Sequence, residues 1–154
     1  MRTIVFSSDQ DLHVTFEQPL TPETFLDVCR HNPERQIEME PDSSITISSL
    51  STPFIGSIEA LFIRELVLFS RKYGGTSYSS STGFTLPDGS VRSPDASYLT
   101  AAQIAKIDPK EFSKFTEMVP KFVVEVRSGS DGLKKLQRKM TDTWMANGVE
   151  PACW

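Results

Sequence analysis

The apolar run Phe122-Val123-Val124-Glu125-Val126 constrains the fold of this chain more than any other feature. A run of this composition is typical of a strand that is buried on both faces. Glu125 interrupts it with a carboxylate, and burying a carboxylate costs several kcal/mol unless a cation or a metal compensates the charge. Natural sequences tolerate such a cost mostly at functional sites. The run therefore predicts a central strand and a functional site around Glu125.

Two further charged residues lie where the same fold can bring them to Glu125. Asp95 follows a proline and precedes a short strand-like segment, residues 96–99. If this segment pairs with the Glu125 strand, opposite side chains come within about 5 Å of each other. Lys139 lies at the border of the apolar stripe of a helix predicted over residues 131–146. Packing that stripe on the sheet brings Lys139 near the two carboxylates.

Two carboxylates and a lysine suit the hydrolysis of a phosphodiester. The reaction needs a nucleophilic water, neutralisation of the developing negative charge and stabilisation of the leaving oxygen. A magnesium ion, or manganese in its place, does most of this when two carboxylates hold it and leave positions free for water and phosphate. We therefore expect Asp95 and Glu125 to hold the metal and Lys139 to orient or deprotonate the water.

Each of these residues also has a structural interpretation, which the sequence leaves open. Asp95 can be a turn residue after its proline. Glu125 can form an ion pair with Arg92, Arg127 or a helix lysine. A lysine such as Lys139 at a helix border is typical of a solvated side chain whose aliphatic part packs on the surface. The combination of the three residues, in this order, favours the functional interpretation.

The other elements indicate a single α+β domain, for which 154 residues provide a sizeable core. The alternation of helices with strands is typical of a mixed α/β sandwich. The predicted elements are a short helix from Thr21, a hairpin of residues 35–39 and 45–47, a helix over 57–73, strands at 76–80, 83–86 and 96–99, an irregular segment over 101–120 with a helical turn or two, a strand over 121–127 and the helix over 131–146.

The net charge of −4 is unevenly distributed along the chain. Residues 1–50 hold three Lys and Arg against nine Asp and Glu, whereas residues 102–154 hold nine against seven. The basic end coincides with the candidate site, and local charge is what attracts phosphate. The modest net acidity therefore does not exclude a nucleic-acid partner, although it argues against tight, non-specific binding to long duplexes.

No segment predicts a membrane partner or export. No apolar run reaches the ~20 residues of a membrane helix, and the first eight residues hold too short an apolar region for a signal peptide. Cys29 and Cys153 have no metal-ligand spacing and fit reduced thiols. We expect a cytoplasmic protein.

Several segments resemble a known family. Pro94-Asp95 followed by Glu125-Val126-Arg127 resembles the PD-(D/E)xK pattern of the restriction-endonuclease-like superfamily, with Arg127 in place of the usual lysine. The stretch from about Asn32 to Trp154 is similar to the Uma family of bacterial endonucleases, long catalogued as a domain of unknown function. The matching segments are Arg35–Glu38, Ser81–Gly89, Arg92–Asp95, Val124–Ser128, Leu133–Met140 and Ala146–Gly148.

This resemblance implies a restriction-endonuclease-like mixed sheet flanked by helices. Residues 32–154 would form that domain, and residues 1–31 an N-terminal extension with a short helix. It also implies a magnesium-dependent endonuclease acting on DNA, in which the motif lysine has moved to the helix at Lys139. We expect Arg127 and Lys135 to contact substrate phosphates.

Three more acids match family positions or lie near them. We expect Glu38, Glu59 and Glu65 to be structural ahead of functional. The end of the chain, residues 151–154, departs from the strand that family members carry there, so we expect a truncated final strand. That departure favours a rival function, a catalytically inactive relative that acts as an interaction or nucleic-acid-binding module. A homodimer is left open.

Overall fold

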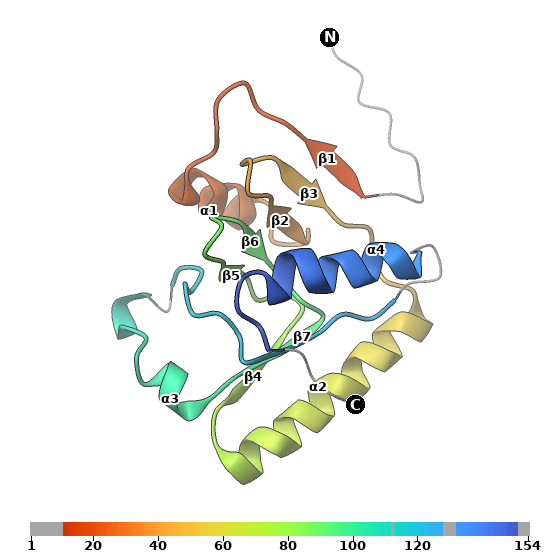
Figure 1. Cartoon of the computed structure of the whole chain (residues 1–154). Coiled ribbons are helices and arrows are strands. Elements are labelled where there is room, and N and C mark those ends of the chain that lie inside the picture. Colours follow the sequence, from red (N-terminus) through yellow and green to blue (C-terminus); the bar gives the residue numbers. More distant parts are fainter. Residues whose placement is uncertain (1–10, 112, 128–131, 151–154) are drawn as a thin grey trace.

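The computed structural model describes residues 11–111, 113–127 and 132–150. Its strands form two antiparallel sheets, with helices packed around them (Figure 1). The first sheet has the order β1 (Leu12–Val14), β3 (Ile45–Ile47), β2 (Ile37–Met39), β6 (Val91–Arg92), β5 (Phe84–Thr85), and the second has the order β4 (Thr76–Ser79), β7 (Ala96–Leu99), β8 (Phe122–Val124). The helices are α1 (Pro22–His31), α2 (Pro53–Tyr73), α3 (Ala101–Ile104) and α4 (Leu133–Arg138); α4 continues as a π-helical segment, Lys139–Met145, and a 3-10 turn spans Pro109–Glu111.

The α+β class expected from the sequence is confirmed, with the strands divided between two sheets. The division falls between β6 and β7, which are separated by Ser93-Pro94-Asp95. Pro94 has no N–H to donate to a ladder, and the N–H of Ser93 donates to the carboxylate of Glu38 instead of to a strand. The chain therefore leaves the first sheet here and enters the second, directly before the first candidate residue.

The predicted hairpin and the first helix are confirmed. β2 and β3 pair antiparallel with Met39 opposite Ile45. α1 begins after Thr21, whose hydroxyl accepts a hydrogen bond from the N–H of Thr24 at 3.2 Å. Phe25 of α1 is fully buried against these strands and Val91 of β6. The division of the chain at residue 31 stays a prediction.

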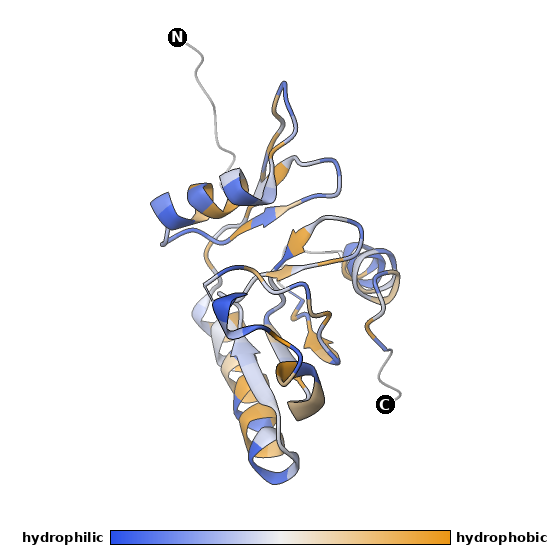
Figure 2. Cartoon of the chain, turned by 90° about the vertical axis from the view of Figure 1, so that its left-hand side faces the viewer, coloured by the Kyte–Doolittle hydropathy of each residue, from blue (hydrophilic) through white to orange (hydrophobic). Residues whose placement is uncertain are grey.

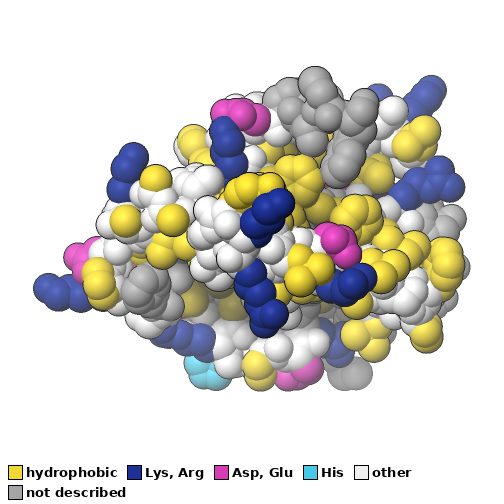
Figure 3. Space-filling model, turned by 90° about the horizontal axis from the view of Figure 1, so that it is seen from below, with side chains coloured by type: hydrophobic (Ala, Val, Ile, Leu, Met, Phe, Trp, Pro, Cys, Tyr) yellow, Lys and Arg dark blue, Asp and Glu magenta, His cyan; other side chains and the backbone are white. Residues whose placement is uncertain are grey.

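α2 begins at Pro53, four residues before the predicted start, because Thr52 caps the helix and proline fits its first position. Several of its large apolar side chains are not covered, since α2 contacts β4 and β7 along one side. Leu61 is 58% exposed and Phe69 is 46% exposed. Figure 2 shows the resulting mixture of hydrophobic and hydrophilic residues along this helix, and Figure 3 shows apolar side chains lying open on the lower face of the molecule.

The strand predicted over residues 121–127 is shorter in the structure. β8 ends at Val124, because its ladder partner β7 begins at Ala96. Glu125 therefore lies one residue beyond the regular strand. The buried cluster of this half of the molecule includes Val123 of β8 and Trp144 of the π-helical segment.

Some expectations lie outside the described residues: the start of the last helix at residue 131, Cys153 and the truncated strand at residues 151–154. None of the described helices combines the length and apolar character that a membrane span requires.

Candidate active site

The end of the β7–β8 pair brings Asp95 and Glu125 together. The last ladder pair is Ala96 opposite Val124, so Asp95 directly precedes and Glu125 directly follows this pair. The charge of Asp95 acts on Glu125, and the charge of Lys139 acts on both, so the two carboxylates belong to one electrostatic cluster. The N–H of Val126 donates to Asp95 Oδ2 at 2.5 Å, which ties the two chain segments together beyond the last ladder residue.

Asp95 is half-buried among negative charges. Burial raises its pKa, and the charges of Glu59 and Glu38 act in the same direction. The Val126 N–H and the Lys139 ammonium act against this rise without cancelling it. Among the described residues, no side chain or N–H donates to its second oxygen, Oδ1, which is therefore free to accept a ligand.

Glu125 is the most deeply buried acid of the site, with a side chain only 6% exposed. Its Oε1 accepts a hydrogen bond from Trp144 Nε1 at 2.7 Å. Lys139 Nζ lies 3.0 Å from Oε1 and 3.1 Å from Oε2. Burial raises the pKa of Glu125 to about 7, because the loss of hydration outweighs the attraction of Lys139. The ion pair therefore compensates the buried charge only in part.

Lys139 is the cation of the site. Besides Glu125, its Nζ lies 3.7 Å from Glu38 Oε1. Burial opposes its charged form, but Glu38, Glu125 and Asp95 together raise the pKa of Lys139 above its ordinary value. Lys139 is therefore a charged donor at neutral pH. This state suits orienting a water or a phosphate oxygen and does not suit removing a proton.

Glu38 proves to be part of the site, although the sequence favoured a structural role. It is buried on β2, and Ser93 N–H donates to its Oε1 at 2.7 Å. Its Oε2 lies 3.6 Å from Arg92 Nη1. Arg92 also forms a two-pronged pair with Glu40. Arg92 thus pairs with these two acids of β2 and its turn, and not with Glu125, which the sequence had left open.

The two acids of α2, Glu59 and Glu65, differ in whether their charge acts on Asp95. Glu59 lies close enough to Asp95 for its charge to raise the pKa of Asp95, and its own carboxylate accepts a hydrogen bond from Ser51 at 3.1 Å. Glu65 is exposed and pairs with its neighbour Arg64 at 3.2 Å. Of the two, only Glu59 contributes to the electrostatics of the site.

The two expected phosphate contacts lie at the periphery. Arg127 is exposed two residues after Glu125. Lys135 is on the exposed side of α4, with Nζ 3.4 Å from Asp11 Oδ2. Neither side chain is shown to approach the carboxylates, and their roles stay predictions.

The oxygen ligands of the site suit magnesium. Within the described residues, no group of three or more His, Cys, Asp and Glu lies close enough together to hold a metal ion. The pair Asp95 and Glu125 remains, and Mg²⁺ is typically held by one or two carboxylates plus waters and substrate phosphates. The free Oδ1 of Asp95 and the only partly compensated charge of Glu125 fit such an ion.

The residue that sequence reasoning missed is Trp144. It lies within the helix predicted over residues 131–146 and is not among the predicted site residues, yet its Nε1–H is the shortest contact that Glu125 makes among the described residues. The signal was present, because a buried tryptophan N–H needs an acceptor. Which acceptor it finds depends on the pairing of distant segments.

The chain was compared with known protein families and curated proteins. A family model, Uma2, described as "Putative restriction endonuclease", matches residues 22–150. The matched region contains Glu38, Asp95, Glu125 and Lys139. No curated protein matches the chain.

Proposed function

The chain belongs to the Uma2 family, and from this premise we propose that it is a metal-dependent endonuclease that hydrolyses phosphodiester bonds of DNA. The observation that carries the proposal is the convergence of three groups. Asp95 and Glu125 flank the last residues of the β7–β8 pair, and Lys139 contacts Glu125 at 3.0 Å. Their order along the chain is that of the acid, acid and displaced lysine expected from the family resemblance.

Asp95 and Glu125 would hold the ion, magnesium or manganese. When bound, such an ion lowers the pKa of a coordinated water and neutralises charge on the phosphate. The protein contributes two carboxylates whose positions are fixed by hydrogen bonds. The N–H of Val126 holds the carboxylate of Asp95, and the Trp144 N–H holds the carboxylate of Glu125.

Lys139 would act on the substrate side of the carboxylates. Its ammonium is held by Glu125 and faces Glu38 across 3.7 Å. A charged donor in this position can orient the attacking water or a phosphate oxygen, and hydrogen bonds to charged groups are the strong ones. Glu38 fixes the direction of the ammonium and, through Ser93, the loop that carries Asp95.

A second candidate is a catalytically inactive relative that binds nucleic acid or a protein. The contacts of Glu125 favour it, because both carboxylate oxygens already have donors without any metal. A buried ion pair of this kind can be purely structural.

The test is magnesium-dependent nicking of a supercoiled plasmid. Lys139→Ala should lower the rate by roughly 10²–10⁴-fold, which is the usual scale for a lost acid–base or orienting group. The matched control is Lys134→Ala, since Lys134 is exposed on α4 and should change only affinity and salt dependence. Both variants are purified in parallel with the wild type.

Equal nicking by wild type and Lys139→Ala would identify a contaminating nuclease or a surface role for this lysine. Absence of nicking by the wild type with either metal would favour the inactive relative.

Three further expectations accompany the proposal. Arg127 and Lys135 would contact phosphates of the bound strand. A cytoplasmic location follows from the cysteine content and is testable by fractionation. A homodimer is testable by analytical ultracentrifugation.

A further inference from the structure

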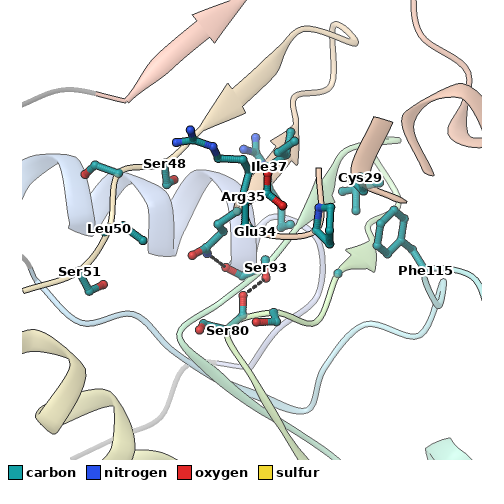
Figure 4. A pocket seen from close by; sticks show the side chains of 17 residues that line it. Cys29, Glu34, Arg35, Ile37, Ser48, Leu50, Ser51, Ser80, Ser93 and Phe115 are labelled. Carbon is teal, nitrogen blue, oxygen red and sulfur yellow. Dashed lines mark hydrogen bonds between the residues drawn. The ribbon is translucent and has the colours of Figure 1, made fainter. Parts of the chain in front are cut away.

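A cavity of about 360 Å³ lies beside the candidate active site. It is formed by the end of α1, the segment leading into β2, the segment after β3 and the loop between β4 and β5 (Figure 4). Its size is at the small end of the roughly 300–1,000 Å³ range of ligand pockets. This volume suits one small polar molecule rather than a length of duplex.

Hydroxyl groups dominate the polar part of the lining. Figure 4 shows Ser48 and Ser51 on one side of the cavity, Phe115 on the other, and Ser80 with Ser93 below them. Within the described part of the chain, the hydroxyls of Ser48, Ser80 and Ser81 form no hydrogen bond. They are therefore available to a ligand.

The lining contains three charged side chains, of which one cation is available to a ligand. Arg35 is exposed at the cavity and has no ion-pair partner in the described ranges. Arg92 also lines the cavity, but Glu40 and Glu38 already pair with its guanidinium. Glu34 is exposed at the rim. An arginine fork beside free hydroxyls is the typical recognition chemistry for a phosphate.

The apolar part of the lining offers an aromatic ring. Phe115 packs on Phe25 with ring centroids 5.6 Å apart. Gly83 allows this position, because a Cβ there would come within 2.5 Å of the Phe115 ring. Ile37 and Leu50 complete the apolar surface. Aromatic and apolar side chains of this kind accept nucleobases.

Two contacts join the cavity to the candidate active site. Ser93 lines the cavity, its N–H donates to Glu38, and it precedes Pro94-Asp95 directly. Ser51 lines the opposite side and donates to Glu59, whose charge acts on Asp95. The cavity therefore borders the segment that leads into Asp95 and is linked to Glu59 on its other side.

We propose that the cavity is a subsite for one nucleotide of the DNA strand, held unstacked next to the phosphodiester that Asp95 and Glu125 address. The proposal rests on the proposed function. Arg35 binds the phosphate of this nucleotide, the free serines bind its sugar and base edges, and the base lies against Phe115, Ile37 and Leu50. Unstacking costs a few kcal/mol, least for single-stranded or mismatched DNA, so such substrates are preferred.

The probe is 2′-deoxyadenosine 5′-monophosphate, titrated into the full chain in a chelator and followed by amide shifts in ¹H–¹⁵N NMR. Saturable shifts are expected at Arg35, Gln36, Ser80 and Ser81. Arg35→Ala should weaken binding about 10- to 100-fold, the scale of a charge-assisted hydrogen bond. The matched control is Arg64→Ala, because Arg64 lies on α2 away from the cavity and should leave binding unchanged.

A second variant fills the cavity without removing a charge. Ser81→Phe should abolish binding, whereas Ser57→Phe, an exposed serine of α2 outside the lining, should not. Thermal melts of all four variants verify that they fold. Deoxyadenosine and inorganic phosphate are titrated separately, and both should bind at least tenfold more weakly than the nucleotide.

Three results would overturn the subsite: no saturable shifts, equal losses for Arg35→Ala and Arg64→Ala, or inorganic phosphate binding as tightly as the nucleotide. Binding in a chelator needs no turnover, so it is scored independently of nicking. A chain that binds the nucleotide in this cavity and never nicks DNA would refute the endonuclease and keep the subsite. A chain that nicks DNA and binds no nucleotide would do the reverse.

Discussion

The pKa of Glu125 is set by two opposing effects, its burial and its attraction to Lys139. Burial raises this pKa more than the attraction of Lys139 lowers it, so the pKa is raised to about 7. In an unfolded chain, where it is hydrated, the same carboxyl has its ordinary pKa of 4.5. The unfolded state thus loses its proton first as pH rises, which makes the ionised residue a burden on the fold.

We predict that Glu125→Gln raises stability in a chelator, and increasingly so with pH. The gain should be near zero at low pH, where the carboxyl is protonated in both states. It should grow through the window from 4.5 to about 7 and reach about 3 kcal/mol at most. Urea unfolding at pH 5 and pH 8 measures it.

The control for this prediction is Glu117→Gln, since Glu117 is exposed. It should change stability by less than about 0.5 kcal/mol at either pH. A loss of several kcal/mol for Glu125→Gln at pH 8 would show that the carboxylate is half of a structural ion pair.

At Arg92, attraction to the neighbouring carboxylates outweighs the effect of burial, so the charged form is favoured. Its side chain is 9% exposed and joins Glu38 to Glu40. Although burial opposes it, the hydrogen bonds and charge of Arg92 hold the pKa of Glu40 below its usual range. The stabilisation from that pair is present at neutral pH and is lost as pH falls through the lowered pKa.

Arg92→Met should therefore destabilise the protein by about 3–5 kcal/mol, because it leaves two partly or fully buried carboxylates facing each other. Urea unfolding at neutral pH measures the change. Arg64→Met serves as the control and should cost less than about 1 kcal/mol, since the Arg64–Glu65 pair is exposed. Similar losses for the two variants would contradict the structural role of Arg92.

Among the secondary-structure elements, the π-helical segment explains how Lys139 and Trp144 of one helix both contact Glu125. Lys139 and Trp144 are five residues apart, and in an α-helix they would point about 140° away from each other. The wider π turn, with Ala146 N–H bonded to the carbonyl of Thr141 five residues earlier, brings both onto the same face. Such segments are frequent at functional sites.

Trp144→Phe tests this arrangement, because it removes the N–H donor while keeping an aromatic ring in the core. Glu125 Oε1 then loses its 2.7 Å donor, and we expect a loss of about 1–3 kcal/mol. Introducing the same change into Glu125→Gln should cost less, since a neutral amide is less dependent on that donor. Equal costs in the two backgrounds would mean that Trp144 contributes by packing alone.

At the scale of the molecule, acids gather where the two sheets and α2 meet. Glu38 comes from the first sheet, Glu59 from α2 and the pair Asp95 and Glu125 from the second sheet. Lys139 is the cation that faces them. The one lysine does not balance the charge of the four acids. A cation that binds among them in the folded state therefore stabilises the fold.

Magnesium or manganese should therefore raise the melting temperature of the wild-type chain, with a shift that grows with metal concentration. Asp95→Asn and Glu125→Gln should each abolish the shift, because these two carboxylates are the whole proposed ligand set. Lys139→Ala should retain it, since an ammonium is not a ligand. Calcium-free buffer with a chelator gives the baseline, and a shift that persists in Asp95→Asn would place the metal elsewhere.

Local sequence patterns were enough to predict several helices and strands and to single out the buried acid Glu125. Capping and proline positions predicted α1, alternation predicted the β2–β3 hairpin, and the acid in the apolar run marked Glu125. These features depend on neighbours along the chain, which is why local patterns predict them.

Which side chains come into contact depends on how distant segments pack together. Pro94 divides the strands into two sheets, a π turn places Trp144 beside Lys139, and Glu38 joins the site from the other sheet. Such contacts arise between segments far apart in the sequence, where pairing and burial set the neighbours. They leave no periodic signal in any one segment, because their free energy depends on how several segments pack together.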